Sequence, residues 1–471
     1  MAWRAPVPPL VGRRALLAGG FLFAAGLAGT GCRRRAARAV SRPSRRSPAA
    51  SSATGPPPVG LYFATPIPQA TQAALAQGVA VAVPGISLQP GAVVRGETPS
   101  WWFECSAPPV VGAPVDLGPG LRAVNFDPAV LVPGAQNIPG FVQRPGQIAM
   151  PVGLAPMAVD WNPAALEAAG IGALPAAWTL DQFEATCALL EASIAAGKLQ
   201  AAGVSQVLYP LQGTPAGRFE YDPATGAEWS VVTAELATAP LWEAFIQGFG
   251  GTVAGPGGIR WDQGAALVGV QRLIDLFRRF GSGPAPALTQ AALGAAWKAS
   301  AMRIVHVYQF LAPPQAEARR VPGLAPFPTL PARPVLPATA QAGYLEWSPG
   351  GPGQGVGPPP RALAPTQAEA VLTAARYLAW QYQDAQQRLF VEGGVAPVTV
   401  GGLRHADYWT ALGLGTAADL VFPYAWSVAG EAVLRSGLAS VGRQALADPG
   451  SLQDALRTLS GRLTAAEAAA P

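Results

Sequence analysis

The sequence predicts an α/β protein in which helices alternate with short buried strands. Several segments combine a helix start signal with apolar residues at helical spacing, and others are short apolar segments bounded by Pro and Gly. Interleaving of the two kinds favours largely parallel sheets. At 471 residues the chain is too long for one ordinary core, which favours two lobes or domains.

The helices are predicted from their ends. Asn162 is a good N-cap, Pro163 suits the first helical position, and Gly170 fits a left-handed end. Thr179 and Gln182 form a capping-box pair at the start of the next helix. Further helices are expected after a cap at Asp262 (ending before Gly281), after a capping box at Thr366 and Glu369, over about 428–446, and after Ser451.

Apolar residues three and four positions apart give three of these helices a buried face. The faces consist of Phe183, Cys187, Leu190 and Ile194; of Leu267, Val270, Ile274 and Phe277; and of Val371, Ala375, Leu378 and Tyr382.

Short apolar segments predict the strands, and prolines predict the loops between them. The chain has 55 Gly and 50 Pro, so its regular elements should be short. Loops are expected at 313–337 and 349–360. The predicted strands are 60–64, 101–104, 147–151, 157–160, 302–308 and 344–347.

The net charge of +5 does not indicate a nucleic-acid-binding protein. Ten of the 32 basic residues lie before position 47, where there is no acidic residue. The remainder has 22 basic and 27 acidic residues, a net charge of about −5. A nucleic-acid footprint needs basic residues on the folded surface, so we expect no nucleic-acid partner.

Residues 1–32 have the features of an export signal. Arg13-Arg14 precedes the uncharged segment 15–31, and the small residues before Cys32 resemble a bacterial lipobox, in which the Cys thiol is lipidated; Gly29 stands where a bulky aliphatic residue is usual. The segment "GRRALL" resembles a twin-arginine signal, but an ordinary positively charged signal start fits equally, so the export route stays open.

Residues 33–58 consist mainly of Arg, Ser, Pro and Ala and predict a disordered linker. Seven arginines there would add roughly 1 kcal/mol each near an anionic surface. A lipidated Cys32 and this basic linker together predict a membrane anchor on an exported protein, periplasmic or on the outer face of the cytoplasmic membrane. Cys105 and Cys187 show no spacing typical of a disulfide, so buried free thiols are expected.

The segment "QIAMPVGLAPMAVDWNPAALEAAGIGALPAAWTLDQFEATCALL" resembles family 1 extracellular solute-binding proteins of ABC importers. Members have a Pro-ended strand, a Tyr-Asn pair, a helix, Ala-Gly-Ile, Pro, and Trp-Thr before an acidic-aromatic helix start. The matching positions are Met150-Pro151, Trp161-Asn162 (with Trp for Tyr), Ala169-Gly170-Ile171, Pro175 and Trp178-Thr179.

Later segments resemble the family in the expected order. The resemblance covers about 147–460, whereas 59–146 matches poorly. The segments are "WEAFIQGFGGTV", "AAWKASAMRIVHVYQF", "GLAPFPTLP", "YLAWQYQDAQQRLFVEGGVAPV" and "FPYAWSVAGEAVLRSGLASVGRQALADPGSLQDAL".

The resemblance implies a two-lobed, periplasmic-binding-protein-like fold with a ligand cleft between the lobes, preceded by the disordered tether. Lobe 1 would consist of 59–150 and 338–400, and lobe 2 of 151–337 and 401–471. It also implies a small-molecule ligand, expected to be a sugar, ABC permease subunits as partners, and a monomer.

Candidate ligand-binding residues are aromatic, because sugar rings present flat C–H faces that stack on aromatic rings. By family position they are Trp161, Tyr308, Trp347 and Trp426, while only one of Trp101 and Trp102 can face a cleft, and Trp102 is the candidate. Each is also explained by ordinary core packing. Polar candidates are Glu104 and Asp160, with Arg303 and Glu346 beside aromatic positions. Ala155 stands near where some sugar-binding relatives have a carboxylate.

The sequence shows no catalytic or metal motif, so neither an enzyme nor a cofactor is predicted. Its two histidines, His306 and His405, lie in no H-E-x-x-H pattern, and no nucleophile–base pair or paired cysteines occur. Two alternatives to the importer protein remain: a non-transport lipoprotein on the same scaffold, acting as a sensor or interaction module, and a secreted hydrolase, which would need an acid pair that the sequence does not show.

Overall fold

In the computed structural model, the sheet is organised around two long strands, β4 (Met150–Trp161) and β10 (Leu336–Ser348). Its strand order is β2-β1-β3-β10-β4-β8-β5, with β9 also pairing to β4 and β11 to β10. The structure describes residues 59–63, 69–88, 100–106, 115–132, 135–137, 141, 146–209, 220–222, 227–229, 239–255, 257–281, 295–296, 298–306, 324–348, 364–392, 395–406, 420–421 and 426–469. The signal, Cys32 and the linker expected before residue 59 lie outside these residues.

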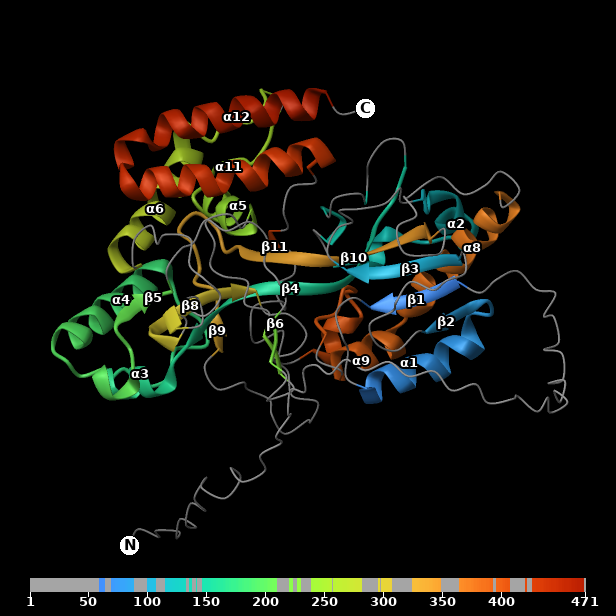
Figure 1. Cartoon of the computed structure of the whole chain (residues 1–471), viewed down its shortest axis with the longest axis horizontal. Helices are drawn as coiled ribbons and strands as arrows, with labels where there is room; N and C mark the ends of the chain where they lie inside the picture. The colour runs from blue at the N-terminus through green and yellow to red at the C-terminus, as the bar shows by residue number, and fades with distance from the viewer. Residues whose placement is uncertain are drawn as a thin grey trace, which may run out of the picture. The chain divides into compact units, whose positions relative to one another are not determined.

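One group of elements, here called lobe 1, packs around the end of the sheet where β10 finishes. Parallel strands β1 and β3 extend β10 on this side, and α2 and α8 pack together over them (Figure 1). Besides β10, lobe 1 consists of β1 (Val59–Phe63), α1 (Gln69–Ala82), β2 (Ile86–Leu88), β3 (Ser100–Ser106), α2 (Gly118–Ala123), α8 (Ala364–Gln381) and α9 (Asp384–Glu392).

The second group, lobe 2, packs around the end of the sheet where β4 finishes. Helices α5 and α6 pack on each other, and the hairpin of α11 and α12 lies against them (Figure 1). The elements are α3 (Pro163–Ala169), α4 (Leu180–Ala195), β5 (Gln206–Leu208), α5 (Ala239–Gly248), α6 (Gly264–Phe280), β8 (Ser300–His306), β9 (Leu324–Pro326), β11 (Leu420–Val421), α11 (Val428–Ala447) and α12 (Leu452–Ala468). A separate two-stranded sheet contains β6 (Glu220–Asp222) and β7 (Ala227–Trp229).

Strand β4 changes its partner part-way along its length. Residues up to Pro156 pair with β10, and residues from Met157 onward pair with β8. Strand β10 also changes its partner, since its earlier residues pair with β4 and its later residues pair with β3 in lobe 1. The two strands therefore carry the chain between the lobes, whereas the residue boundaries expected for each lobe stay a prediction.

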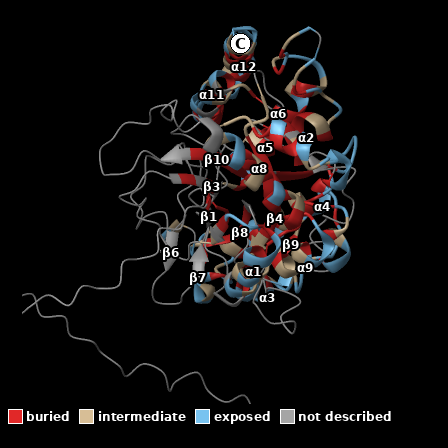
Figure 2. Ribbon diagram, turned by 90° about the vertical axis from the view of Figure 1, so that its right-hand side faces the viewer, coloured by how far each residue is buried: buried red, intermediate tan, exposed pale blue. Residues whose placement is uncertain are grey.

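The core follows the sheet and the inner faces of its helices (Figure 2). The α8 stripe is buried as predicted, and so are Phe183, Cys187 and Leu190 of α4. Cys187 is a free thiol, as expected, and its burial raises its pKa well above the ordinary value.

Local helix signals near residue 170 are confirmed. The Asn162 side chain accepts bonds from the amides of Ala164 and Ala165, and Gly170 ends α3 at φ +74°. Thr179 and Gln182 form the reciprocal capping box of α4.

Several other predictions are wrong. The expected strands 147–151 and 157–160 are one strand, β4, and the expected loop at 313–337 contains β9 and the start of β10. The sheet is mixed rather than largely parallel, because β10 runs antiparallel to β3 and β4.

Two predicted helix starts are also wrong. The N-cap of α6 is Gln263 rather than Asp262, whose carboxylate lies 3.4 Å from Arg457 instead. Helix α8 begins at Ala364, so Thr366 lies inside its first turn.

Candidate functional site

The carboxyl ends of the parallel strands in the two lobes face each other across the middle of β4. In lobe 1, Ser106 at the end of β3 lies opposite Ala342, which in turn pairs with Pro151. In lobe 2, His306 at the end of β8 lies opposite Met157. These points are six positions apart along β4, a span of about 20 Å at the usual rise per strand residue.

This arrangement defines the candidate site. Ligands of open α/β sheets bind outside the carboxyl ends of the strands, where loops and helix starts supply polar groups. Here two such strand ends converge on the segment where β4 and β10 cross between the lobes. A molecule held there would contact both lobes at once.

The predicted residues Glu104 and Tyr308 belong to the chain segments at these strand ends. Glu104 lies two residues before the end of β3, opposite Tyr62 and Tyr344, although its side chain is outside the described part. Tyr308 is the second residue after the end of β8 and lies outside the described residues. As ligand-binding residues, both stay predictions.

Trp102 and Trp347 lie further into lobe 1. Trp102 is opposite Gly60 and Glu346. Trp347 is opposite Trp101, and this pair is one position further from the crossing than the pair of Trp102 and Glu346. Because side chains alternate along a strand, Trp102 and Glu104 share one face of β3 while the buried Trp101 and Phe103 share the other. The alternation predicted for the Trp pair is thus consistent with the fold, but the side chains of Trp102 and Trp347 are outside the described part.

Asp160 and Trp161 lie at the far end of β4, about 10 Å and about 13 Å beyond Met157 by strand rise. Oδ2 of Asp160 lies 2.7 Å from Nη1 of Arg303, its direct cross-strand partner, and Arg303 is 7% exposed. Burial raises the pKa of the Asp160 carboxyl, and the nearby Arg303 charge opposes that rise. The pair joins two strands of lobe 2 away from the strand carboxyl ends, so ligand contact by these residues stays a prediction.

The indole Nε1 of Trp161 is buried and has no hydrogen-bond partner within the described part of the chain. The ring itself is partly buried against the core. Trp161 is thus held at the edge of the lobe 2 core, next to the N-cap of α3.

Trp426 is fully buried in lobe 2. Its Nε1 donates a 3.0 Å bond to Oε1 of Glu243, which is also fully buried, and its ring meets Trp261 edge-on at 6.1 Å between centroids. No face of the Trp426 ring is open to solvent in this conformation. Stacking on a ligand would need this segment to move, and the predicted role stays untested.

Two side chains that the sequence did not single out for the site hold the start of β4. Tyr382 donates from its hydroxyl to the carbonyl of Pro151 at 2.7 Å, and Gln381 donates from Nε2 to the carbonyl of Val152 at 3.0 Å. The only sequence signal was their place at the end of the α8 apolar stripe, before a Gln-rich turn. Their partners lie more than two hundred residues earlier, so no local pattern could reveal the contact.

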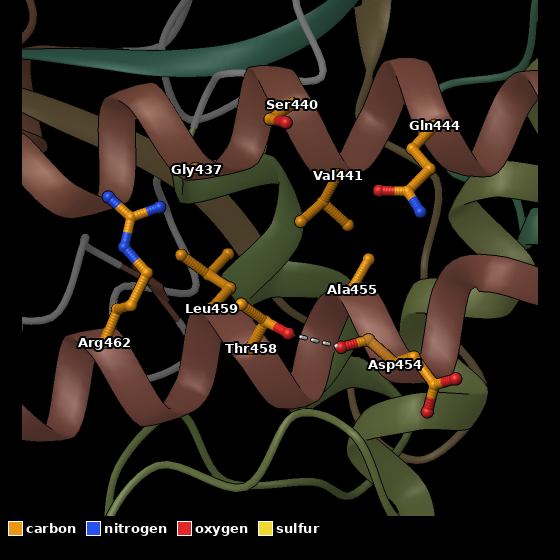
Figure 3. Close-up of a pocket in the computed structure, with 9 residues that line it drawn as sticks. All are labelled: Gly437, Ser440, Val441, Gln444, Asp454, Ala455, Thr458, Leu459 and Arg462. Atoms are coloured by element: carbon orange, nitrogen blue, oxygen red, sulfur yellow. Dashed lines mark hydrogen bonds between the residues drawn. The ribbon is translucent and has the colours of Figure 1, made fainter.

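A pocket of about 220 Å³ lies between α11 and α12, away from these strand ends (Figure 3). Within it the Thr458 hydroxyl donates to the carbonyl of Asp454 at 3.0 Å. Its walls come from two surface helices and include no strand end, so we do not take it as the candidate site. The lining residues are Gly437, Ser440, Val441, Gln444, Asp454, Ala455, Thr458, Leu459 and Arg462.

Within the described ranges, no three His, Cys, Asp or Glu side chains gather as metal ligands would. Nor is any helix there both long and apolar enough to cross a bilayer. Nε2 of His405 lies 3.1 Å from Oδ2 of Asp384, and both side chains are partly exposed.

Comparison with known proteins places the fold. No family model matches the chain, and no curated protein matches it. Solved structures do match over nearly their whole length, but at low sequence identity.

A cyclic α-maltosyl-1,6-maltose-binding protein from Arthrobacter globiformis is 14% identical, with a TM-score of 0.52 and coverage of 88% of this chain and 99% of that one. An ABC substrate-binding protein from Listeria monocytogenes in complex with cycloalternan is 12% identical, with a TM-score of 0.53 and coverage of 87% and 98%. UgpB from Mycobacterium tuberculosis in complex with glycerophosphocholine is 13% identical, with a TM-score of 0.53 and coverage of 88% and 98%. The chain therefore has the two-lobed, periplasmic-binding-protein-like α/β fold of ABC substrate-binding proteins.

Proposed function

We propose that this protein is the substrate-binding lipoprotein of an ABC importer and captures a small solute of the carbohydrate class between its lobes. The observation that carries the proposal is the convergence of the β3 and β8 carboxyl ends on the segment where β4 and β10 cross. A solute bound there would hold both lobes, and closure over it would present one defined surface to a permease.

The class of solute is inferred from the fold's relatives and from the residues. Similar structures include proteins named for cyclic maltosyl-maltose and chitin oligosaccharides, and one was solved with cycloalternan. Glu104 and Tyr308 belong to the chain near the strand ends, and Trp102 lies two residues before Glu104 on β3. An acid with aromatic faces suits sugar hydroxyls and C–H patches. Trp161, Trp347, Trp426 and Asp160 are secondary members of the proposed site.

Glycerophosphocholine, found in one similar structure, is the main competing chemistry. A bound phosphodiester would need fixed positive charge. The one buried arginine near a predicted site residue, Arg303, is already paired with Asp160 within the described residues. This favours a neutral polyhydroxylated solute.

The direct test is a ligand panel on the purified chain. Maltose, cycloalternan, chitooligosaccharides, acarbose and glycerophosphocholine are added in turn, and the unfolding temperature and Trp emission are recorded. A bound solute at about a hundred times its Kd should stabilise the fold by about 2.7 kcal/mol. If no sugar changes either signal while glycerophosphocholine does, the carbohydrate assignment is wrong; if nothing binds, the importer function is unsupported.

Site residues are tested on whichever sugar binds. Glu104→Gln and Trp102→Ala should weaken binding without lowering the unfolding temperature of the unliganded protein. Trp347→Ala is the matched aromatic change further from the crossing, and we expect a smaller loss of affinity. Equal losses from Trp102 and Trp347 would contradict a site at the strand ends.

We further propose anchoring through a lipid on Cys32, assisted by the seven arginines of the linker. After signal cleavage, Cys32→Ser should leave the protein in the soluble exported fraction. A variant that stays membrane-bound would show that the anchor is elsewhere. The cognate permease subunits would then be the membrane partner, and a monomer is expected.

A further inference from the structure

Strand β4 contains a bulge near its start, at the lobe 1 edge of the segment where the chain crosses between the lobes. Gln341 pairs with Gly153, but the next residue of β10, Ala342, pairs with Pro151. Val152 is therefore an extra residue without a partner in the ladder. Bulges bend a strand and increase its local twist, so this is where the direction of β4 is set.

Both carbonyls at the bulge are held by side chains from the end of α8. Tyr382 donates to the carbonyl of Pro151 at 2.7 Å, and Gln381 donates to that of Val152 at 3.0 Å. Tyr382 is 8% exposed and Gln381 is fully buried. Burial makes these bonds costly to lose, since a freed carbonyl would have no water nearby.

The residues that hold the bulge are themselves fixed to lobe 1. Gln387 donates from Nε2 to the carbonyl of Gln381 at 3.0 Å, and its Oε1 accepts from the Val398 amide. The Tyr382 ring also lies 5.7 Å from Phe126 between centroids. The bulge is thus tied to lobe 1 through the turn between α8 and α9.

The carboxamide of Gln381 is only half used. Its Oε1 is buried and accepts no hydrogen bond from any described residue. Among the described residues, the attachment of Gln381 to the bulge is thus made through its Nε2 alone.

We propose that Gln381 and Tyr382 are positioning residues that set the resting angle between the lobes by holding the β4 bulge against lobe 1. The inference rests on the proposed function, because it concerns closure over a solute at the same crossing. Residues at the ends of elements commonly absorb the backbone change in hinge motion. Loosening the two bonds should let β4 leave lobe 1 over a wider range of angles.

The test measures the separation of the lobes directly. Spin labels are attached through non-canonical amino acids at Val81, which ends α1 in lobe 1 and is 85% exposed, and at Leu189 on α4 in lobe 2, which is 57% exposed. Chemistry independent of thiols is needed because the chain has three cysteines, one of them the neighbouring Cys187. Pulsed dipolar spectroscopy on the full chain then gives the distribution of inter-lobe distances without any solute.

Tyr382→Phe removes one hydroxyl and keeps the ring, and Gln381→Met removes the donor at similar volume. We expect each to broaden or shift the distance distribution, and the double variant to change it most. Tyr377→Phe is the matched control, because it makes the same change inside α8, shortly before the turn that contains Tyr382, and its ring packs on Phe103 of β3 at 5.4 Å between centroids. Its distribution should superimpose on that of the parent.

Unfolding temperatures are recorded alongside. A lower unfolding temperature with an unchanged distance distribution would overturn the proposal, because the bonds would then contribute stability alone. An equal change in the Tyr377→Phe control, or failure of both single variants to fold, would overturn it as well. The distance measurement needs no solute. A ligand panel in which nothing binds would therefore count against the proposed function, but it would not change the outcome of the distance measurement.

Discussion

The guanidinium of Arg303 lies 2.7 Å from the carboxylate of Asp160, Nη1 to Oδ2, on directly opposed residues of β8 and β4. Despite this partner, burial raises the pKa of Asp160 above its ordinary value. The folded state therefore keeps its proton on Asp160 to higher pH than the unfolded chain does. Any stability from this group is present at low pH and is lost as pH rises through the folded pKa.

From this we expect Asp160→Asn to flatten the pH dependence of stability. The free energy of unfolding in urea is compared for parent and variant from about pH 3, below the usual Asp pKa of about 3.9, to about pH 6, above it. The decline with rising pH should be smaller in the variant. Asp454→Asn, an exposed carboxylate change on α12, is the control, and an Asp160→Asn slope matching the parent would contradict the assignment.

Gly343 of β10 should not tolerate a side chain. A Cβ there would lie 2.6 Å from Cζ of Phe103 and 2.7 Å from Cγ1 of Val152, the bulged residue. We expect Gly343→Ala to lower the free energy of unfolding by about 1–3 kcal/mol, as overpacking of a core does.

The matched change is Gly461→Ala in α12, where a Cβ meets nothing within 4 Å. Alanine in an exposed helix should stabilise by up to about 1 kcal/mol. Chemical denaturation of both variants measures the difference. Equal effects would mean that the close approach at the bulge does not exist in solution.

The Thr179 capping box should contribute measurably to α4. Thr179→Ala removes the bond that its hydroxyl accepts from the Gln182 amide, at an expected cost of about 1 kcal/mol in unfolding free energy. Gln263→Ala at the start of α6 is the comparison, because Gln263 makes no side-chain cap bond and should cost less. Denaturant titration followed by circular dichroism would detect the difference.

Glu243 should support the buried indole of Trp426. Glu243→Leu leaves the Trp426 Nε1 without this acceptor and should cost about 1–3 kcal/mol, whereas Glu243→Gln keeps an acceptor oxygen and should cost less. Unfolding followed by Trp emission reports both. Losses of equal size would show that the bond contributes nothing.

Local signals in the sequence predicted local structure. Asn162 and Thr179 cap their helices because the groups they bond lie two or three residues away. Asp262 is not the cap of α6, and its Oδ2 lies 3.4 Å from Nε of Arg457, far along the chain. A local pattern cannot reveal such a long-range ion pair.

The long strand β4 was missed because it contains residues that usually end strands. Pro151 adjoins the bulge, and Pro156 is the last residue paired with β10 before β8 takes over at Met157. Proline is tolerated where a ladder is interrupted or changes partner. The prolines are visible in the sequence, but the strand pairing that makes them acceptable in β4 is not.

The candidate site was only partly predictable for the same reason. The resemblance to solute-binding proteins gave the fold and an approximate region, yet strand register decides which residues lie near the crossing. Register placed Glu104 close to it and Asp160 far along lobe 2. The bonds from Gln381 and Tyr382 to β4 depend on packing across more than two hundred residues.

The interleaving of β4 and β10 sets an order of events during synthesis. When a ribosome has released β4, its neighbour β10 is still to be made, and residues 162–335, which contain α3 to α6, β5, β8 and β9 of lobe 2, emerge in between. Helix α8 and its two holding side chains come later still. We therefore expect lobe 2 to acquire structure on the nascent chain while the first half of lobe 1 waits with an open sheet edge, a period in which chaperones would find most to bind.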